Sequence, residues 1–361
     1  MIRPLLPVRE GSPQPAQTTS VMTQSSPDTA SVVERTRHCT ADAAIVAVHF
    51  LMETAVFVLG EEALLIVRDA EPRRVAIHGG AILASGADGM RVVTGGDDGQ
   101  VVATDAAGAS TSVAADARRR WIDHVALGPG GAVAWSAGKQ AFVRSGKSAS
   151  KEGVEHVLEA PSSVGALAFS PKGFRLAIAH YNGATLWFPN AAQADPEMLP
   201  WKGSHLAASF SPDGRFLVTS MQEPTLHGWR LADHKDMRMQ GYAARVRCLD
   251  WTADGKWLAS SGSNQLILWP FQSKTGPMGK TPLVLAPGEA QAEMVACHPT
   301  QGVVAVGYAD GLVLIVRLPD GAEILARKPA AAPVTALAWS RDGKLLAFGT
   351  EDGDAGIVDL G

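Results

Sequence analysis

Short apolar stretches recur along this chain at an almost constant spacing. One kind of stretch, such as VVTGGDDG at 92–99 or LAFGTEDG at 346–353, runs directly into a turn rich in Gly, Asp or Asn. Eight copies of it begin 36 to 46 residues apart. They span 56–63, 92–99, 133–140, 176–183, 217–224, 258–265, 304–311 and 346–353. A period near 40–45 residues is typical of a repeated four-stranded β unit.

Each copy sits in the same local pattern. An apolar stretch such as 206–211 precedes it, and the tight turn Ser211-Pro212-Asp213-Gly214 joins the two. Pro presets φ at the first turn position and Gly accepts a positive φ at the end, which favours a hairpin. A third stretch (312–317 in the seventh copy) and a more polar fourth stretch (323–328) follow. The pattern predicts an all-β fold, and since no segment suits a crossover helix it excludes a parallel sheet.

The repeats resemble those of the WD-repeat β-propellers. Trp187, Trp229 and Trp269 end third strands, where that family places the Trp of its Trp-Asp pair. An acidic or amide residue stands in the turn between second and third strands at Asp98, Asn182, Asn264, Asp310 and Asp352. The resemblance covers about residues 32–361 and implies a single propeller of eight four-stranded blades, with seven as the alternative count. We expect the three Trp rings to pack blade against blade.

The chain departs from the family in two motifs. The Gly-His pair before the first strand is nearly absent, and only Gly203-Ser204-His205 is similar to it. The Asp after each Trp is replaced by Phe188, Arg230 or Pro270. These departures concern the buried Asp-His-Ser/Trp hydrogen-bond network that stiffens standard WD blades, and they leave the propeller prediction intact.

The two ends of the chain predict how the ring closes. The last copy stops after its third strand, GIVDL at 356–360, while SVVERTRH at 31–38 is left over before the first copy. We expect 31–38 to pair with 356–360 and complete the last blade, as in WD-repeat propellers. Residues 1–31, rich in Pro, Ser, Thr and Gln, are predicted to be a disordered tail before the propeller at 32–361. Met22 is an alternative start, in which case residues 1–21 are a mis-assigned start.

Composition narrows the class of protein. The chain has 361 residues, 32 basic against 36 acidic, and 46% hydrophobic residues, which favours a core-forming protein over a disordered one. The net charge of −4 argues against a nucleic-acid partner, and the lack of about 18 consecutive apolar residues argues against a membrane span. Cys39, Cys248 and Cys297 are widely spaced, which predicts free thiols and a cytoplasmic location.

Motifs for catalysis and metal binding are weak. The chain has no Gly-x-Ser-x-Gly element, no phosphate-binding Gly-x-x-x-x-Gly-Lys-Ser/Thr and no His-Glu-x-x-His. The pairs His38-Cys39 and Cys297-His298 are adjacent in sequence, and neighbouring strand residues point to opposite faces. The acidic turn residues suit Ca²⁺ ligation in principle, but Asp is also an ordinary turn residue. We therefore predict no catalytic residues, no metal and no cofactor.

The resemblance implies a non-enzymatic scaffold that docks a partner protein or peptide on one face and is a monomer outside its complex. The predicted contact residues are Arg119, Arg120, Trp121, His205, Tyr242 and Arg245 before first strands, and Asp98, Asn182, Asp310 and Asp352 in the turns after second strands. Arg and Trp are enriched in interface hot spots.

One alternative is a propeller enzyme, a metal- or carboxylate-dependent hydrolase or lactonase with its site in the channel. Another is an RNA scaffold using Arg118–Arg120, which the net charge disfavours.

Overall fold

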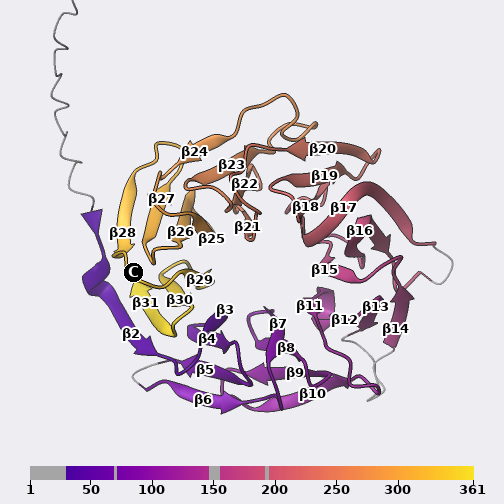
Figure 1. Ribbon diagram of the computed structural model, residues 1–361, viewed down its shortest axis with the longest axis horizontal. Coiled ribbons are helices and arrows are strands. Elements are labelled where there is room, and N and C mark those ends of the chain that lie inside the picture. Colours follow the sequence, from indigo (N-terminus) through magenta and orange to yellow (C-terminus); the bar gives the residue numbers. More distant parts are fainter. Residues whose placement is uncertain (1–29, 69–70, 146–154, 192–194) are drawn as a thin grey trace, which may run out of the picture.

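The strands form a ring of sheets around a central opening (Figure 1). The computed structural model describes residues 30–68, 71–145, 155–191 and 195–361. Within these ranges the helical elements are two short 3-10 turns, η1 (Val33–Arg35) and η2 (Pro129–Gly131). The first strand of each unit lies beside the opening and the fourth at the rim (Figure 1). The predicted single all-β propeller is thus correct.

The first three sheets are four-stranded meanders, in which each strand pairs antiparallel with the next. The first sheet comprises β3 (Ile45–Leu51), β4 (Thr54–Leu59), β5 (Ala63–Val67) and β6 (Arg73–Ala76). The second comprises β7 (Ile82–Ala87), β8 (Arg91–Gly96), β9 (Gln100–Asp105) and β10 (Ser110–Ala115). The third comprises β11 (His124–Leu127), β12 (Val133–Ala137), β13 (Gln140–Arg144) and β14 (Glu155–Glu159).

The next sheet has six strands. It comprises β15 (Val164–Phe169), β16 (Leu176–Trp187), β17 (Glu197–Phe210), β18 (Phe216–Met221), β19 (Leu226–Arg230) and β20 (Lys235–Met239). Asn182 and Gly183 both have positive φ, as a two-residue hairpin turn needs, so β16 holds two strands of the sequence pattern. β17 pairs with β16 through 197–200 and with β18 through 205–210. It is therefore the last strand of the fourth copy and the first strand of the fifth.

Three further sheets complete the ring. One comprises β21 (Leu249–Trp251), β22 (Trp257–Ser260), β23 (Leu266–Pro270) and β24 (Leu283–Leu285). Another comprises β25 (Ala292–Cys297), β26 (Val303–Tyr308), β27 (Val313–Arg317) and β28 (Glu323–Arg327), with β1 (Ala30–Ser31) at its edge. The last comprises β29 (Val334–Trp339), β30 (Leu345–Thr350), β31 (Asp354–Asp359) and β2 (Thr36–Thr40).

The number of sheets differs from the predicted eight four-stranded blades. The described residues form seven hydrogen-bonded sheets, not eight separate four-stranded blades. The reason is the unbroken β17, which joins the fourth and fifth sequence copies in one sheet. The eight second-strand copies seen in the sequence lie in β4, β8, β12, β16, β18, β22, β26 and β30.

At the junction of the chain ends, an N-terminal strand lies on the C-terminal one. β2 pairs antiparallel with β31, from Thr36 opposite Val358 to Thr40 opposite Asp354. The predicted bounds of 31–38 differ from those of this strand, because 33–35 form η1 and Ala30–Ser31 pair in parallel with β28. Apart from these two residues, the predicted tail 1–31 lies outside the described part of the chain. Whether the fold requires this pairing stays a prediction.

The core fills the spaces between neighbouring units. Trp187, Trp229 and Trp269 are 7%, 1% and 7% exposed. Each belongs to an apolar cluster that joins two consecutive copies; for example, Trp269 packs with Phe216 and Met237 of the preceding copy. The predicted packing role of these rings is thus confirmed. Truncation of such a ring typically costs about 3–5 kcal/mol of stability.

Candidate functional site

Two kinds of connection share one face of the disc. Because the strands within each unit are antiparallel, connections alternate between the two faces, and those before first strands lie with the turns after second strands. Hydrogen bonds join the two kinds directly: Gly79 N donates to Asp98 Oδ2 at 2.9 Å, and Gly203 N to Asn182 Oδ1 at 3.3 Å. We call this side the loop face.

A β-bulge recurs where first strands begin on this face. In six first strands the pairing with the second strand skips one residue directly after the first pair. The skipped residues are Val46, Leu83, Gly165, Leu206, Glu293 and Thr335. Val46, Leu83 and Leu206 are 47%, 40% and 36% exposed, while the residues just before them are buried. A bulge bends the strand and redirects a side chain, so these apolar groups reach solvent beside the opening.

Three of the bulges, at Leu83, Gly165 and Leu206, border a cavity of about 760 Å³, which we call the channel-mouth cavity. It extends over five consecutive sequence copies. Its lining residues are Leu83, Trp121, Asp123, His124, Ser163, Val164, Gly165, Leu206, Ala207, Ser220, Arg245, Val246 and Arg247. Trp121 is 63% exposed and is the largest apolar side chain among them. Exposed apolar groups rimmed by polar ones are typical of an interaction site.

The loop at 116–121 holds Trp121 in place through Asp116. The Asp116 carboxylate accepts hydrogen bonds from the backbone N–H groups of Arg118 (2.9 Å) and Arg120 (3.1 Å) and from Arg120 Nη2 (2.6 Å). The hydrogen bonds from Arg120 keep the pKa of Asp116 below its usual value. Gly99 packs so tightly on this loop that a Cβ would lie 2.9 Å from Arg119 Cα. Arg119 and Trp121 are therefore displayed on a fixed backbone, an arrangement that lowers the entropy cost of binding.

The polar groups of the cavity differ in how strongly they are held. Arg245 is exposed and donates to Gln222 Oε1 at 3.4 Å, while Arg247 Nη1 lies 3.6 Å from Glu293 Oε2. His124 Nε2 donates to the Val164 carbonyl at 3.1 Å, and burial lowers the pKa of His124. The imidazole is therefore neutral at pH 7. The cavity combines apolar surface with two Arg side chains and the carboxylate of Asp123.

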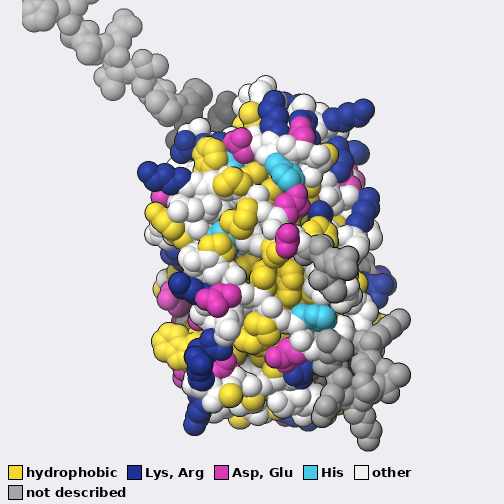
Figure 2. Space-filling model, turned by 90° about the vertical axis from the view of Figure 1, so that its right-hand side faces the viewer, with side chains coloured by type: hydrophobic (Ala, Val, Ile, Leu, Met, Phe, Trp, Pro, Cys, Tyr) yellow, Lys and Arg dark blue, Asp and Glu magenta, His cyan; other side chains and the backbone are white. Residues whose placement is uncertain are grey.

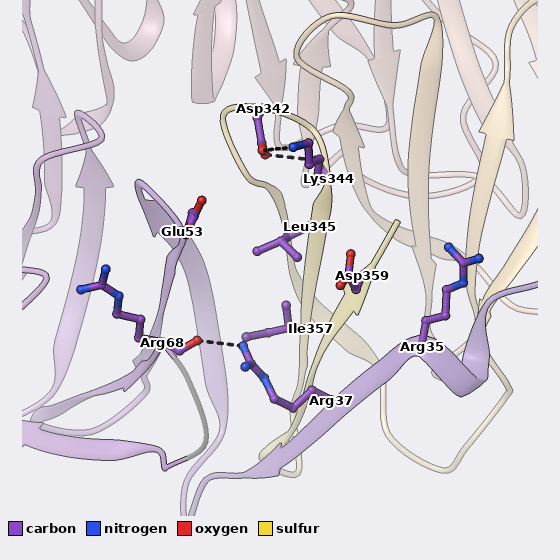
Figure 3. Close-up of a pocket in the computed structure, with 9 residues that line it drawn as sticks. All are labelled: Arg35, Arg37, Glu53, Arg68, Asp342, Lys344, Leu345, Ile357 and Asp359. Atoms are coloured by element: carbon purple, nitrogen blue, oxygen red, sulfur yellow. Dashed lines mark hydrogen bonds and ion pairs between the residues drawn. The ribbon is translucent and has the colours of Figure 1, made fainter. Parts of the chain in front are cut away.

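A second cavity of about 450 Å³ lies where β2 meets β31 (Figure 3). Four basic and three acidic side chains contribute to its lining. They are Arg35, Arg37, Arg68 and Lys344 with Glu53, Asp342 and Asp359. Arg37 Nη2 donates to the Arg68 carbonyl at 3.1 Å, and Lys344 Nζ lies 3.7 Å from Asp342 (Figure 3). Because its charges nearly cancel and none of its residues is a large exposed hydrophobic, we place the candidate binding site at the channel mouth.

Comparisons with known proteins support one family for this chain. Residues 295–361 match the family model for the anaphase-promoting complex subunit 4 WD40 domain, and residues 235–270 match that for the WD domain, G-beta repeat. Both matches support the WD-repeat β-propeller family for this chain. The crystal structure of the computationally designed Ika8 protein has a TM-score of 0.71 at 18% identity, over 89% of this chain and 97% of that one. At this identity the likeness shows the fold alone. No curated protein sequence matches the chain.

The family's buried network is present in this propeller in altered form. The Asp98 carboxylate only accepts, so His78 Nδ1 donates to it at 3.1 Å and His78 Nε2 accepts from Thr94 Oγ1 at 2.8 Å. Burial by itself raises the pKa of Asp98, but the hydrogen bonds from Gly79, Gln100 and His78 outweigh it and lower that pKa. Sequence reasoning missed His78 because it precedes Gly79, the reverse of the family's Gly-His order.

Tyr242 forms a corresponding network in the sixth copy. Trp269 Nε1 donates to the Tyr242 hydroxyl at 2.7 Å, and this hydroxyl donates to Ser260 Oγ at 2.7 Å. Tyr242 is 8% exposed. In the fifth copy, His205 is 1% exposed and lies 2.7 Å from Thr219 Oγ1 and 3.1 Å from the Trp201 carbonyl. Both side chains are used inside the propeller, so the structure favours a structural role for Tyr242 and His205, and their predicted contact with a partner stays a prediction.

The remaining predicted contacts fall into two groups. Trp121 and Arg245 line the channel-mouth cavity, and Arg119 stands on the loop that carries Trp121. The other residues mainly build the loops. Asp98 is bound to His78, Arg120 to Asp116 and Gln140, Asn182 to Gly203 N, Asp310 to Leu312 N, and Asp352 to Thr350 Oγ1. Sequence reasoning missed Asp116, Leu83, Leu206 and Arg247, which it had no means to place at the opening.

The side of the molecule shown in Figure 2 has no single dominant patch. Hydrophobic, basic and acidic side chains are interspersed over the rim seen in Figure 2. In the described ranges, no group of three or more His, Cys, Asp or Glu side chains is placed to hold a metal ion. No helix in the same ranges is long and apolar enough to cross a bilayer.

Proposed function

We propose that this WD-repeat propeller is a non-enzymatic scaffold that binds a partner protein or peptide at the channel-mouth cavity. The fold supports an interaction scaffold in general terms, because WD-repeat propellers commonly bind partner proteins. The observation that carries the choice of site is the arc of exposed apolar side chains, Leu83, Trp121 and Leu206, beside Arg245. Trp and Arg are the residue types that most often dominate binding energy.

The proposed mechanism is docking onto a preformed surface. A partner side chain enters the cavity of about 760 Å³ and buries apolar area against Trp121 and Leu206. Arg119 and Arg245 orient acidic or carbonyl groups of the partner at the edge. Since Asp116 fixes the Trp121 loop in advance, little ordering is needed on binding. We also propose that the protein acts in the cytoplasm and is a monomer outside its complex; its three unpaired thiols are consistent with a reducing compartment.

The test is quantitative affinity capture from native lysate with matched variants. We expect Arg119→Glu/Trp121→Ala to lose the main partner by more than about tenfold, since hot-spot truncations cost about 2 kcal/mol or more. The control is Met90→Ala/Arg341→Glu, which makes the same types of change at exposed first-to-second strand turns on the opposite face. Equal recovery of all partners by wild type and both variants would contradict the proposed site.

A further inference from the structure

The face opposite the channel mouth holds a basic pocket of about 690 Å³. Arg175 and Arg215 reach it from the turns after β15 and β17, Arg230 from the end of β19 and Asp233 from the turn after β19. Lys274 comes from the long connection between β23 and β24. Arg215 Nη1 and Arg230 Nη1 donate to the carbonyls of Ser273 (3.4 Å) and Lys274 (3.3 Å), which holds that connection over the pocket. We call this the basic pocket.

The cations of the basic pocket exceed its anions. Arg230 Nη2 lies 2.5 Å from Asp233 Oδ2, and Arg215 pairs with Asp213. Arg175 and Lys274 form no ion pair with any residue that the structure describes. Two positive charges on the lining are thus uncompensated, in contrast to the cavity at β2, where opposite charges nearly cancel.

Arg175 is half-buried and has no hydrogen bond to a carboxylate of the described residues. Its guanidinium lies 5.4 Å from the ring centre of Phe210 and 5.9 Å from that of Phe188. Its Nε is buried without a hydrogen-bond partner, and its Nη2 has only a 3.5 Å contact with Ser170 Oγ. Burial lowers the pKa of Arg175 below its usual value, while Glu197 acts in the opposite direction. A half-buried cation without a carboxylate partner is unfavourable, and the two aromatic rings fix the plane of its donors.

We propose that the basic pocket binds a phosphate anion, either as inorganic phosphate or as a phosphate monoester. Arg175 and Lys274 supply the uncompensated charge, and Arg215 and Arg230 border the site with donors already oriented by Asp213 and Asp233. The planar guanidinium fork suits two oxygens of one phosphate, and Lys adds a mobile point charge. This site lies on the face opposite the proposed partner site, so either proposal can fail without the other.

The first experiment measures phosphate binding by the full-length protein. Sodium phosphate is titrated against a chloride series of equal ionic strength, with melting temperature and isothermal titration calorimetry as readouts. We expect a saturable rise in melting temperature with phosphate for the wild type, and its loss in Arg175→Gln. Since Arg175→Gln can itself weaken the fold, Lys274→Gln is the second variant, and we expect its Kd for phosphate to rise at least tenfold.

The matched control is Lys280→Gln, on the same connection but outside the pocket lining. Its Kd is expected to equal that of the wild type. A phosphoserine-containing peptide distinguishes the two sources of phosphate: tighter binding than inorganic phosphate indicates a phosphorylated partner, and equal binding indicates free phosphate. The proposal is overturned if phosphate and peptide act no differently from chloride, or if Lys274→Gln and Lys280→Gln weaken binding equally.

Discussion

The loop face contains two sets of residues that look alike in the sequence but differ in the structure. Trp121 and Arg245 are exposed and line the channel-mouth cavity, and Arg119 is exposed on the loop that carries Trp121. His205 and Tyr242, from equivalent connections, are buried in hydrogen-bond networks with Thr219 and Ser260. Residue type alone therefore does not separate binding positions from structural ones. The two sets differ in where their side chains end: those of His205 and Tyr242 reach a hydroxyl of a second strand, whereas those of Trp121 and Arg245 line the cavity.

The exposed and buried residues of the loop face keep their positions only while the ring of sheets is closed. Deleting the N-terminal strand that pairs with β31 is therefore expected to have the largest effect on stability. Removal of residues 1–40 deletes β2 and its five residue pairs with β31. At about 0.5–1.5 kcal/mol for each hydrogen bond, the loss is a large part of a typical total of about 5–15 kcal/mol. We expect this truncation to melt far lower or to aggregate. Removal of residues 1–21 should change little. Equal melting of both truncations, measured by circular dichroism, would show that the pairing is dispensable.

A buried histidine of the propeller, His227, leads us to expect a loss of stability in acid. His227 is fully buried between Trp201 and Trp229, and burial lowers its pKa to about 3. In the unfolded chain the imidazole of His227 takes up a proton below about pH 6.5, whereas in the folded protein it stays neutral. The free energy of unfolding therefore falls as the pH drops from 6.5 towards 3. We expect about 3 kcal/mol to be lost by pH 4.

The measurement is urea denaturation at pH 7 and pH 4. His227→Phe keeps the aromatic stack and should flatten the pH dependence, while the control His156→Gln, on the rim strand β14, should not. An unchanged pH dependence in His227→Phe would mean that other groups cause the loss.

Tyr242→Phe tests the structural role of the buried loop-face residues, and its expected effect on stability is smaller than that of removing β2. Loss of the hydroxyl leaves Trp269 Nε1 and Ser260 Oγ without this partner, and we expect about 1–3 kcal/mol lower stability. Tyr181→Phe is the matched control, because Tyr181 is 53% exposed. Equal urea midpoints for the two variants would remove Tyr242 from the structural set.

Trp121→Ala should have the smallest effect on stability. Its ring is 63% exposed, and exposed substitutions usually change stability by less than about 0.5 kcal/mol. A thermal melt checks this expectation against Met90→Ala, a control on the opposite face that is 72% exposed. A drop of several degrees in Trp121→Ala alone would place Trp121 with the structural residues.

The sequence was informative where the pattern repeats and uninformative where neighbouring units meet. Periodicity was enough for the all-β propeller and for the packed Trp187, Trp229 and Trp269. It did not reveal that β17 continues through two copies, because the strand shows no break that a period could predict. The basic pocket combines Arg175, Arg230 and Lys274 from three copies, and only their contacts in the ring bring these distant residues together.

The most direct test measures partner recovery and melting temperature together for Trp121→Ala and Tyr242→Phe. The account predicts opposite results for the two variants. Trp121→Ala should melt like the wild type and lose the partner, while Tyr242→Phe should melt lower and, at a temperature where it is folded, retain the partner. Partner recovery that follows melting temperature in both variants, with Trp121→Ala binding as well as the wild type, would contradict the division of the loop face into binding and structural residues.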